Sequence, residues 1–149
     1  MADILHRVSI AAPPSEVHDL IATKQGIQSW WTGSPVEGDA AVGERLALYF
    51  GDRDAPSAVM EVLADTPEEI AWRCVDGPAD WLETRVTFAL KPGLGGGTTL
   101  LFSHAGWREP NEFMGGCTTN WGSYLTSLKA GAEGGGFGAY PAGEVSRWG

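Results

Sequence analysis

The chain has few basic residues, and this shortage excludes two classes of partner. Its 149 residues include ten Lys and Arg against 19 Asp and Glu, which gives a formal net charge of −9. Surfaces that bind nucleic acid neutralise phosphates with clustered Lys and Arg, and anionic membranes attract basic segments in the same way. The ten basic residues are scattered along the chain. We therefore expect neither nucleic acid nor an anionic membrane surface as a partner.

Long hydrophobic runs and cysteine pairs are also missing. No stretch approaches the roughly 20 apolar residues of a membrane-spanning helix, and residues 1–7 (MADILHR) lack the apolar core of a secretory signal. Cys74 and Cys117 stand alone, without the C-x-x-C spacing of a metal or redox site. These features predict a cytoplasmic protein with no membrane span and with two buried structural thiols.

Motifs that carry catalysis or bind cofactors are absent as well. There is no Gly-x-Ser-x-Gly nucleophile motif, and no His, Cys, Asp and Glu combination has metal-ligand spacing. The glycine-rich run at residues 93–97 has no following Lys-Ser or Lys-Thr and leads into a strand, so it predicts a flexible hairpin rather than a phosphate loop. We therefore predict no catalytic residue, no metal and no cofactor.

Tryptophan, in contrast, is abundant, with seven residues in the chain. The length fits one domain with a core that needs no disulfide or metal. A Trp side chain combines a large apolar surface with one N–H that seeks a partner. Seven of them in a small domain predict either an aromatic core or a cavity with aromatic walls.

The apolar pattern predicts six strands and three helices. Val17, Leu20 and Ile21 have helical spacing after the first strand, and Thr23 is placed to cap a second short helix that carries Trp30 and Trp31. A long helix from Asn111 to about residue 130 follows the strands. The strands are expected at residues 4–11, 45–50, 58–64, 69–75, 82–91 and 98–105.

The connections between the later strands are short and rich in Gly, Pro and Asp, which favours antiparallel neighbours. Trp121, Leu125 and Leu128 on the last helix are expected to be buried against this sheet. Gly134, Gly135 and Gly136 end the helix and begin a glycine-rich tail. We divide the chain into a domain of residues 1–130 and a tail of residues 131–149. We expect the tail to be poorly ordered or loosely docked; the alternative is that it folds back so that Tyr140 and Pro141 cap a cavity mouth.

Several short motifs occur in an order that resembles a known family. They are residues 10–17 (IAAPPSEV), Trp30-Trp31, residues 62–67 (VLADTP), residues 70–72 (IAW), residues 97–107 (GTTLLFSHAGW) and residues 120–129 (NWGSYLTSLK).

Together these motifs resemble the START-like (SRPBCC) superfamily and, within it, the activators of the heat-shock-protein-90 ATPase and their stand-alone bacterial relatives. The resemblance implies an α+β helix-grip fold. In this fold a curved antiparallel six-stranded sheet wraps around a long C-terminal helix, with two short helices after the first strand. The superfamily includes lipid carriers, hormone sensors and cyclases, and the family name records a co-chaperone. The resemblance thus raises the expectation of a ligand cavity without naming a reaction.

The candidate cavity residues come from the faces of the strands and helices that should point inward. His104 is the ionisable member, in phase with Leu100 and Phe102 on its strand. It either orients a polar group of a ligand or is a core imidazole held by a backbone or hydroxyl partner. The candidates are Trp30, Trp31, Met60, Trp72, Phe88, Phe102, His104, Phe113, Trp121 and Tyr124.

Three functions follow from these observations. The leading prediction is a non-enzymatic domain that binds a small hydrophobic or amphipathic ligand between the sheet and the last helix. The first alternative is a protein-interaction module, such as a chaperone ATPase activator or a stress-related co-chaperone, which would use an exposed patch. The second alternative is a cyclase or hydrolase that uses His104.

Overall fold

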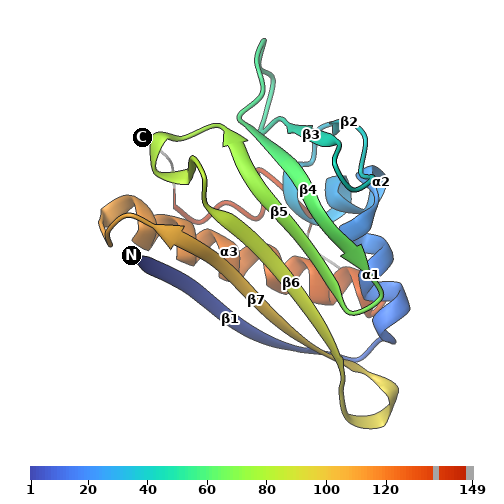
Figure 1. The fold of residues 1–149 in the computed structure, drawn as a ribbon. Coiled ribbons are helices and arrows are strands. Elements are labelled where there is room, and N and C mark those ends of the chain that lie inside the picture. Colours follow the sequence, from blue (N-terminus) through green and yellow to red (C-terminus); the bar gives the residue numbers. More distant parts are fainter. Residues whose placement is uncertain (136–137, 147–149) are drawn as a thin grey trace.

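A curved antiparallel sheet wraps one long helix in the computed structural model, which describes residues 1–135 and 138–146 (Figure 1). Its seven strands follow the order β1-β7-β6-β5-β4-β3-β2, and every neighbouring pair is antiparallel. The strands are β1 (Ala2–Ile10), β2 (Glu37–Gly38), β3 (Arg45–Leu48), β4 (Ala58–Thr66), β5 (Glu69–Asp76), β6 (Arg85–Pro92) and β7 (Thr98–Trp107). The predicted helix-grip fold is confirmed. The sheet has one strand more than predicted, because two-residue β2 is too short to show an apolar alternation.

Two short helices follow β1, as predicted. Helix α1 spans Pro14–Ala22, and its first turn accommodates Pro14 because an N–H there has no helical partner. Thr23 caps α2 (Lys24–Ile27), since its hydroxyl accepts a hydrogen bond of 3.0 Å from the Gly26 N–H. The chain then continues as a π-helical turn, η1 (Gln28–Thr32), which carries Trp30 and Trp31. Short 3₁₀ turns lie at Ala79–Trp81 (η2) and Leu94–Gly96 (η3).

The long helix α3 spans Glu112–Ala132 and crosses the face that the sheet curves around (Figure 1). Asn111 begins it by accepting a hydrogen bond of 2.9 Å from the Met114 N–H. Trp121, Leu125 and Leu128 are 2%, 1% and 0% exposed, so their predicted burial is confirmed. No helix in the described part of the chain is both long enough and apolar enough to cross a membrane.

Aromatic side chains fill much of the space between the sheet and α3. Six tryptophans within the described residues are buried: Trp30, Trp31, Trp72, Trp81, Trp107 and Trp121. Trp31 stacks on Trp30 and on Trp72, with 5.8 Å between ring centroids in both pairs. The aromatic core suggested by the composition is therefore present, and each of these rings contributes a large buried apolar area.

The tail turns back after α3 and lies against it. The Tyr140 N–H donates to the Trp31 carbonyl at 2.9 Å, and the Ser127 hydroxyl donates to the Gly138 carbonyl at 2.7 Å. A methyl group on Gly33 would collide with the Tyr140 carbonyl oxygen, so glycine is needed there for the tail to approach. The division into a domain of residues 1–130 and a tail of 131–149 stays a prediction, although α3 continues to Ala132. Trp148 lies outside the described residues.

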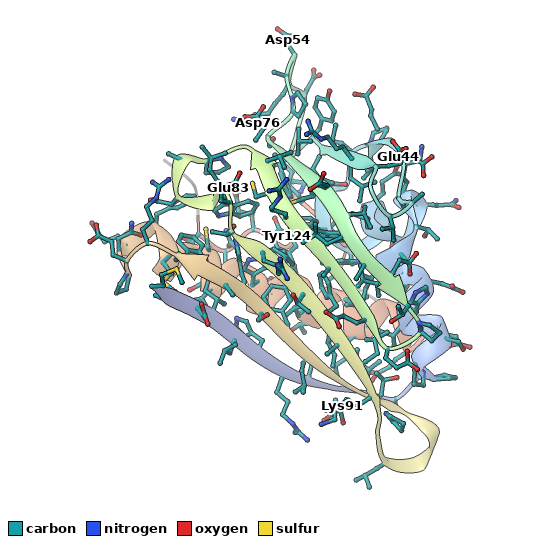
Figure 2. All side chains as sticks on the ribbon, viewed as in Figure 1. Glu44, Asp54, Asp76, Glu83, Lys91 and Tyr124 are labelled. Atoms are coloured by element: carbon teal, nitrogen blue, oxygen red, sulfur yellow. The ribbon has the colours of Figure 1, made fainter. Side chains whose placement is uncertain are left out.

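Acidic side chains occupy the periphery, away from the packed layer. Figure 2 shows Glu44, Asp54, Asp76 and Glu83 at or beside loops, and all four are exposed. Tyr124, by contrast, lies between the sheet and α3 and is 5% exposed. The negative charge is thus mostly solvated and is kept out of the core.

Candidate functional site

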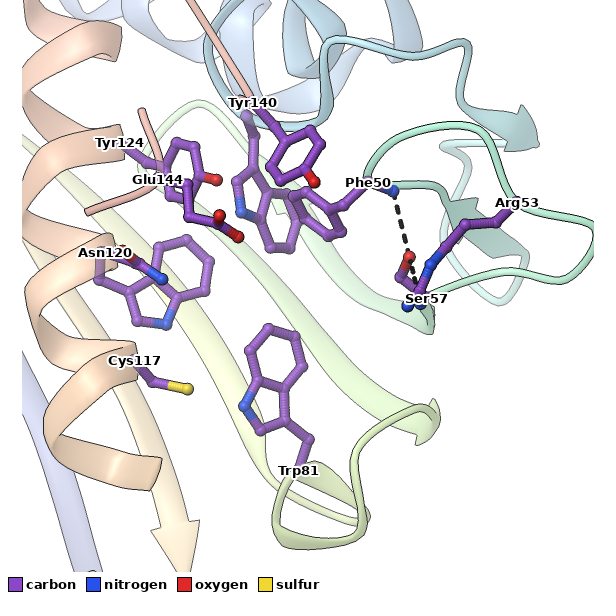
Figure 3. Close-up of a pocket in the computed structure, with 11 residues that line it drawn as sticks. Phe50, Arg53, Ser57, Trp81, Cys117, Asn120, Tyr124, Tyr140 and Glu144 are labelled. Carbon is purple, nitrogen blue, oxygen red and sulfur yellow. Dashed lines mark hydrogen bonds between the residues drawn. The ribbon is translucent and has the colours of Figure 1, made fainter. Parts of the chain in front are cut away.

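A pocket of about 250 Å³ opens between α3, the π-helical turn, the end of β3 and the tail (Figure 3). Its wall is mainly aromatic, with a few polar groups. The lining residues are Trp31, Phe50, Arg53, Ser57, Trp81, Cys117, Asn120, Trp121, Tyr124, Tyr140 and Glu144.

Helix α3 supplies one continuous wall. Cys117, Asn120, Trp121 and Tyr124 are spaced by three, four and seven residues, so they share one face of the helix. All four are buried. The helix therefore sets the position of four lining side chains at once.

The remaining wall comes from segments that are far apart in the sequence. Trp31 belongs to η1, and its ring centroid lies 4.9 Å from that of Trp121. Phe50 follows β3 and meets Trp31 edge-on at 5.4 Å. On its other sides, Phe50 lies 5.7 Å from Tyr140 and 6.4 Å from Tyr124. These four rings, together with Trp121, enclose the deeper part of the pocket.

Asn120 attaches the tail to the pocket wall. Its side-chain oxygen accepts hydrogen bonds from the N–H groups of Val145 and Ser146, both at 2.8 Å, and its nitrogen donates to the Ser146 carbonyl at 2.6 Å. Gly143 lies so close to the Tyr124 ring that an added methyl group would come within 2.6 Å of it. The tail, and with it Glu144, is therefore held against α3.

The two charged residues of the pocket, Arg53 and Glu144, lie on different sides of it. Figure 3 shows Glu144 beside Tyr124 and Tyr140, and Arg53 beside Ser57 across the pocket. Arg53 is exposed and donates to the Ser57 hydroxyl oxygen at 3.2 Å, an oxygen that also accepts from the Phe50 N–H at 3.1 Å. Glu144 is half-buried.

Burial keeps the two inner ionisable groups neutral. The pKa of Tyr124 is raised well above its ordinary value, first by burial and then by the nearby Glu144 and Tyr140. Burial also raises the pKa of the Cys117 thiol to about 11, although a hydrogen bond with Trp81 acts in the opposite direction. A thiol with such a pKa is a poor nucleophile at neutral pH.

His104 lies beside the pocket wall but is not part of it. Its side chain is fully buried. The Trp121 Nε1–H donates to His104 Nδ1 at 3.1 Å, and His104 Nε2 lies 2.7 Å from the Thr84 hydroxyl. Because Trp can only donate, Nδ1 carries the lone pair and Nε2 carries the proton. The Thr84 hydroxyl then donates to the Trp81 carbonyl at 2.5 Å.

This chain of hydrogen bonds requires a neutral imidazole. Burial lowers the pKa of His104 to about 3, and a proton on Nδ1 would also displace the hydrogen bond from Trp121. The arrangement agrees with the sequence alternative of a core imidazole held by a hydroxyl partner. His104 fixes Trp121, and through it one wall of the pocket.

The structure divides the ten predicted cavity residues into three groups. Trp31, Trp121 and Tyr124 line the pocket. Phe113 is half-buried and packs against Trp107, with 6.1 Å between the rings. The others lie in the packed core beside the pocket: Trp30, Met60, Trp72, Phe88, Phe102 and His104. Whether any of the ten contacts a ligand stays a prediction.

Several lining residues were not among the sequence candidates. Cys117 and Asn120 share the spacing of Trp121 and Tyr124, so the helical pattern was a signal that pointed to them. Phe50, Tyr140 and Glu144 lie outside regular strands and helices, where no periodic pattern indicates which way a side chain points. In the described residues, no group of three His, Cys, Asp or Glu is placed to hold a metal ion.

A curved antiparallel sheet that grips one long C-terminal helix is the helix-grip architecture of START-like (SRPBCC) domains. The family model described as "Activator of Hsp90 ATPase homolog 1-like protein" matches residues 11–133. The chain therefore belongs to this family. A search of curated proteins finds no match.

One solved structure supports the same assignment, and others share the fold. The Aha1 protein of Colwellia psychrerythraea, a dimer in solution, is 30% identical, with a TM-score of 0.79 over 91% of this chain and 98% of that one. SSP2350 from Staphylococcus saprophyticus is 17% identical, with a TM-score of 0.75 over 95% of this chain and 99% of that one. PFC0360w, an HSP90 activator from Plasmodium falciparum, is 20% identical, with a TM-score of 0.69 over 86% of this chain and 94% of that one. The last two similarities show the shared fold.

Proposed function

We propose that this domain binds a small, largely apolar molecule in the aromatic pocket between α3 and the tail. The observation that carries the proposal is the hollow itself, which persists although six large aromatic side chains surround it. Ligand pockets are typically about 300–1,000 Å³ and mainly apolar, with a few placed polar groups. A pocket of about 250 Å³ suits a molecule of one or two rings or a short branched chain.

The chemistry of the wall favours binding over catalysis. General acid–base catalysis needs a group whose pKa lies near the working pH, whereas burial raises the pKa of Tyr124 and Cys117 away from neutrality. His104 lies behind the wall and is engaged at both ring nitrogens. Two free, buried cysteines also fit a protein that works in a reducing cytoplasm.

Indole is a suitable neutral probe, and changes in tryptophan emission or in the Trp Nε1–H NMR signals would report its binding. Cys117→Met adds side-chain volume at the pocket wall and should lower the affinity for indole at least about fivefold, because the added atoms occupy the space the probe needs. Thr119→Met is the matched control. It adds the same side chain to an exposed position of α3, so the affinity should stay unchanged.

Saturable binding to the natural chain that Cys117→Met weakens would support the proposal. Equal affinity of the natural chain and Cys117→Met would place the probe elsewhere, and the absence of saturable binding by neutral apolar probes would refute the proposal of a largely apolar ligand.

The family assignment favours a second candidate, the stimulation of an Hsp90-type ATPase. The matched family model and the Plasmodium falciparum relative both carry that activity in their descriptions. The test is the steady-state ATPase rate of a purified Hsp90 with and without this chain. A rate increase that saturates with the concentration of the chain would support an activator, and an unchanged rate would refute it.

A further inference from the structure

The carboxylate of Glu144 is the charged group held closest to the interior of the pocket. It is half-buried, and it makes no hydrogen bond or ion pair within residues 1–135 and 138–146. Removing a carboxylate from water without a partner is costly, yet Asn120 and the close approach of Gly143 to Tyr124 hold this segment in place. The backbone around Glu144 is thus held by Asn120 and by the close approach of Gly143, and its carboxylate has no charged partner among the described residues.

Arg53 does not neutralise this carboxylate. The two residues form no salt bridge, and Figure 3 shows them on different sides of the pocket. Arg53 is exposed, and its guanidinium is directed to the Ser57 hydroxyl at 3.2 Å. An exposed charge is screened by water, so the carboxylate determines the electrostatic character of the inner end of the pocket.

Aromatic rings surround the same end. Phe50 is in ring contact with Trp31, Tyr124 and Tyr140 at centroid distances of 5.4, 6.4 and 5.7 Å. The face of an aromatic ring carries partial negative charge, and it attracts cations within about 6 Å of the centroid. Several aromatic rings and one carboxylate therefore lie together on one side of the pocket, whereas Arg53 lies on the other side.

The charge of Glu144 affects the neighbouring Tyr124 side chain. It contributes to the raised pKa of the Tyr124 hydroxyl, because a second negative charge beside it is unfavourable. The net charge of −9 adds an attraction for positive ligands over a longer range. A positive group would be attracted by the carboxylate, the rings and the overall field.

We propose that the pocket selects a small organic cation, an alkylammonium or quaternary ammonium compound, whose positive group lies between the Glu144 carboxylate and the rings of Phe50, Tyr124 and Tyr140. This inference rests on the pocket being a binding site, as proposed above, and it specifies the chemical class of the ligand.

Choline and 3,3-dimethylbutan-1-ol test the inference directly. The two molecules have nearly the same shape and volume, and they differ in that a quaternary carbon replaces the positive nitrogen. NMR titration of the natural chain should show choline binding about tenfold more tightly than the neutral alcohol, since cation–π contacts and one partly buried carboxylate each contribute to discrimination.

Glu144→Gln assigns the preference to the carboxylate. It keeps the size and the backbone contacts of the residue but removes its charge. Choline should therefore bind at least about fivefold more weakly, while the affinity for the neutral alcohol stays unchanged. The matched control is Glu68→Gln, which removes the same charge from an exposed turn outside the pocket and should leave both affinities as they are. Thermal melting of each variant verifies that the fold is intact.

The outcomes separate this inference from the proposed function. Equal affinities for the two isosteres, or an unchanged preference in Glu144→Gln, would overturn the cation inference. Tighter binding of acetate or 3,3-dimethylbutanoate than of choline would assign selectivity to Arg53 and would also overturn it. If indole binds and choline does not, the pocket is a site for neutral ligands; if neither binds, both proposals fail.

Discussion

At the scale of single residues, His104 shows how a buried polar group defines its surroundings. A neutral imidazole both donates and accepts, and here it joins Trp121, which only donates, to Thr84, whose hydroxyl passes the chain on to a backbone carbonyl. Each hydrogen bond in this series has a fixed donor and acceptor: Trp121 donates to His104, His104 donates to the Thr84 hydroxyl, and that hydroxyl donates to the backbone carbonyl. A fully satisfied network of this kind fixes the orientation of its members, and in this way β7 and the turn before β6 determine the position of an indole on α3.

Replacing His104 should change how stability depends on pH. Its pKa is lowered from 6.5 in the unfolded chain to about 3 in the folded one. Between these values the unfolded state binds a proton that the folded state does not, so the free energy of unfolding falls as the pH drops, by up to about 1.4 kcal/mol per unit. His104→Gln preserves one acceptor and one donor but does not titrate. Its free energy of unfolding should therefore lack this decrease between pH 6 and pH 4. Urea unfolding at several pH values measures it.

His6→Gln provides a graded comparison for this experiment. Burial also lowers the pKa of His6, but His6 is only partly buried, and a hydrogen bond with Thr118 acts in the opposite direction. Its replacement should alter the pH dependence in the same direction but by less. Identical pH dependence in the natural chain and in His104→Gln would show that His104 is charged or solvated in the folded state.

The inward direction of His104 and the possibility of a core imidazole were predictable from the sequence, but its partners were not. The alternation of residues 98–105 places it on the same side as Leu100 and Phe102, and all three are buried. Its partners lie 20 and 17 residues away in the chain, at Thr84 and Trp121. A pattern that repeats every two or four residues contains no information about contacts at that separation.

At the scale of structural elements, the tail contributes as much to the pocket as a regular strand would. Tyr140 and Glu144 complete a wall that α3 begins, and Asn120 on α3 holds that part of the chain. Three hydrogen bonds from one buried amide give the segment a fixed position without secondary structure. The pocket is therefore formed jointly by a helix and an irregular segment.

Asn120→Ala should release this segment. Without the side-chain amide, the N–H groups of Val145 and Ser146 lose their acceptor and should exchange with solvent at least about tenfold faster. Affinity for pocket ligands should fall as well, because Tyr140 and Glu144 would no longer be held at the wall. Hydrogen exchange measured by NMR tests the first effect, and an indole titration tests the second.

Thr126→Ala serves as the control for this variant. Thr126 is exposed on the same helix, and its hydroxyl donates to the Gly122 carbonyl within α3. It should leave the exchange of Val145 and Ser146 unchanged. Slow exchange at both positions in Asn120→Ala would mean that other contacts suffice to hold the tail.

The regular elements could be predicted because each repeats a simple pattern along the chain. Alternation revealed β4–β7, and the spacing of Trp121, Leu125 and Leu128 revealed α3. The π-helical geometry of residues 28–32 was not predictable, since Trp30 and Trp31 fit an α-helical stripe equally well. The docking of the tail depends on Asn120, Gly33 and Gly143. Their contacts with distant segments form only in the folded chain, so no local sequence pattern indicates them.

At the scale of the whole molecule, the excess of acidic groups is a source of repulsion that packing must overcome. The net charge is −9, and exposed acids such as Glu44, Asp54 and Asp76 lie at or beside loops. Like charges on a compact chain are closer together than on an unfolded one, so they destabilise the folded state.

Added salt should therefore stabilise the protein. Raising NaCl from about 10 mM to about 200 mM shortens the screening length from roughly 30 Å to less than 10 Å, and the melting temperature should increase by a few degrees. A variant that combines Glu44→Gln and Asp54→Asn should respond less, because it has less repulsion to screen. A melting temperature that decreases with salt would show that attractive pairs, such as Arg73 with Glu61, dominate instead. Thermal unfolding followed by circular dichroism decides between the two.

The pairing of β1 with β7 also determines the order in which the molecule can be built. Ile10 pairs with Thr98 and Ala2 with Trp107, so the strand of this sheet that is made first has as its neighbour the strand that is made last. Contacts between such distant parts of a chain form slowly, and an unpaired strand edge is prone to aggregation until they do. The sheet edge can close only after residues 98–107 have left the ribosome, and the pocket is complete only after Tyr140 and Glu144 follow. A growing chain thus completes this pocket only after the whole sheet, α3 and the segment of Tyr140 and Glu144 have been made.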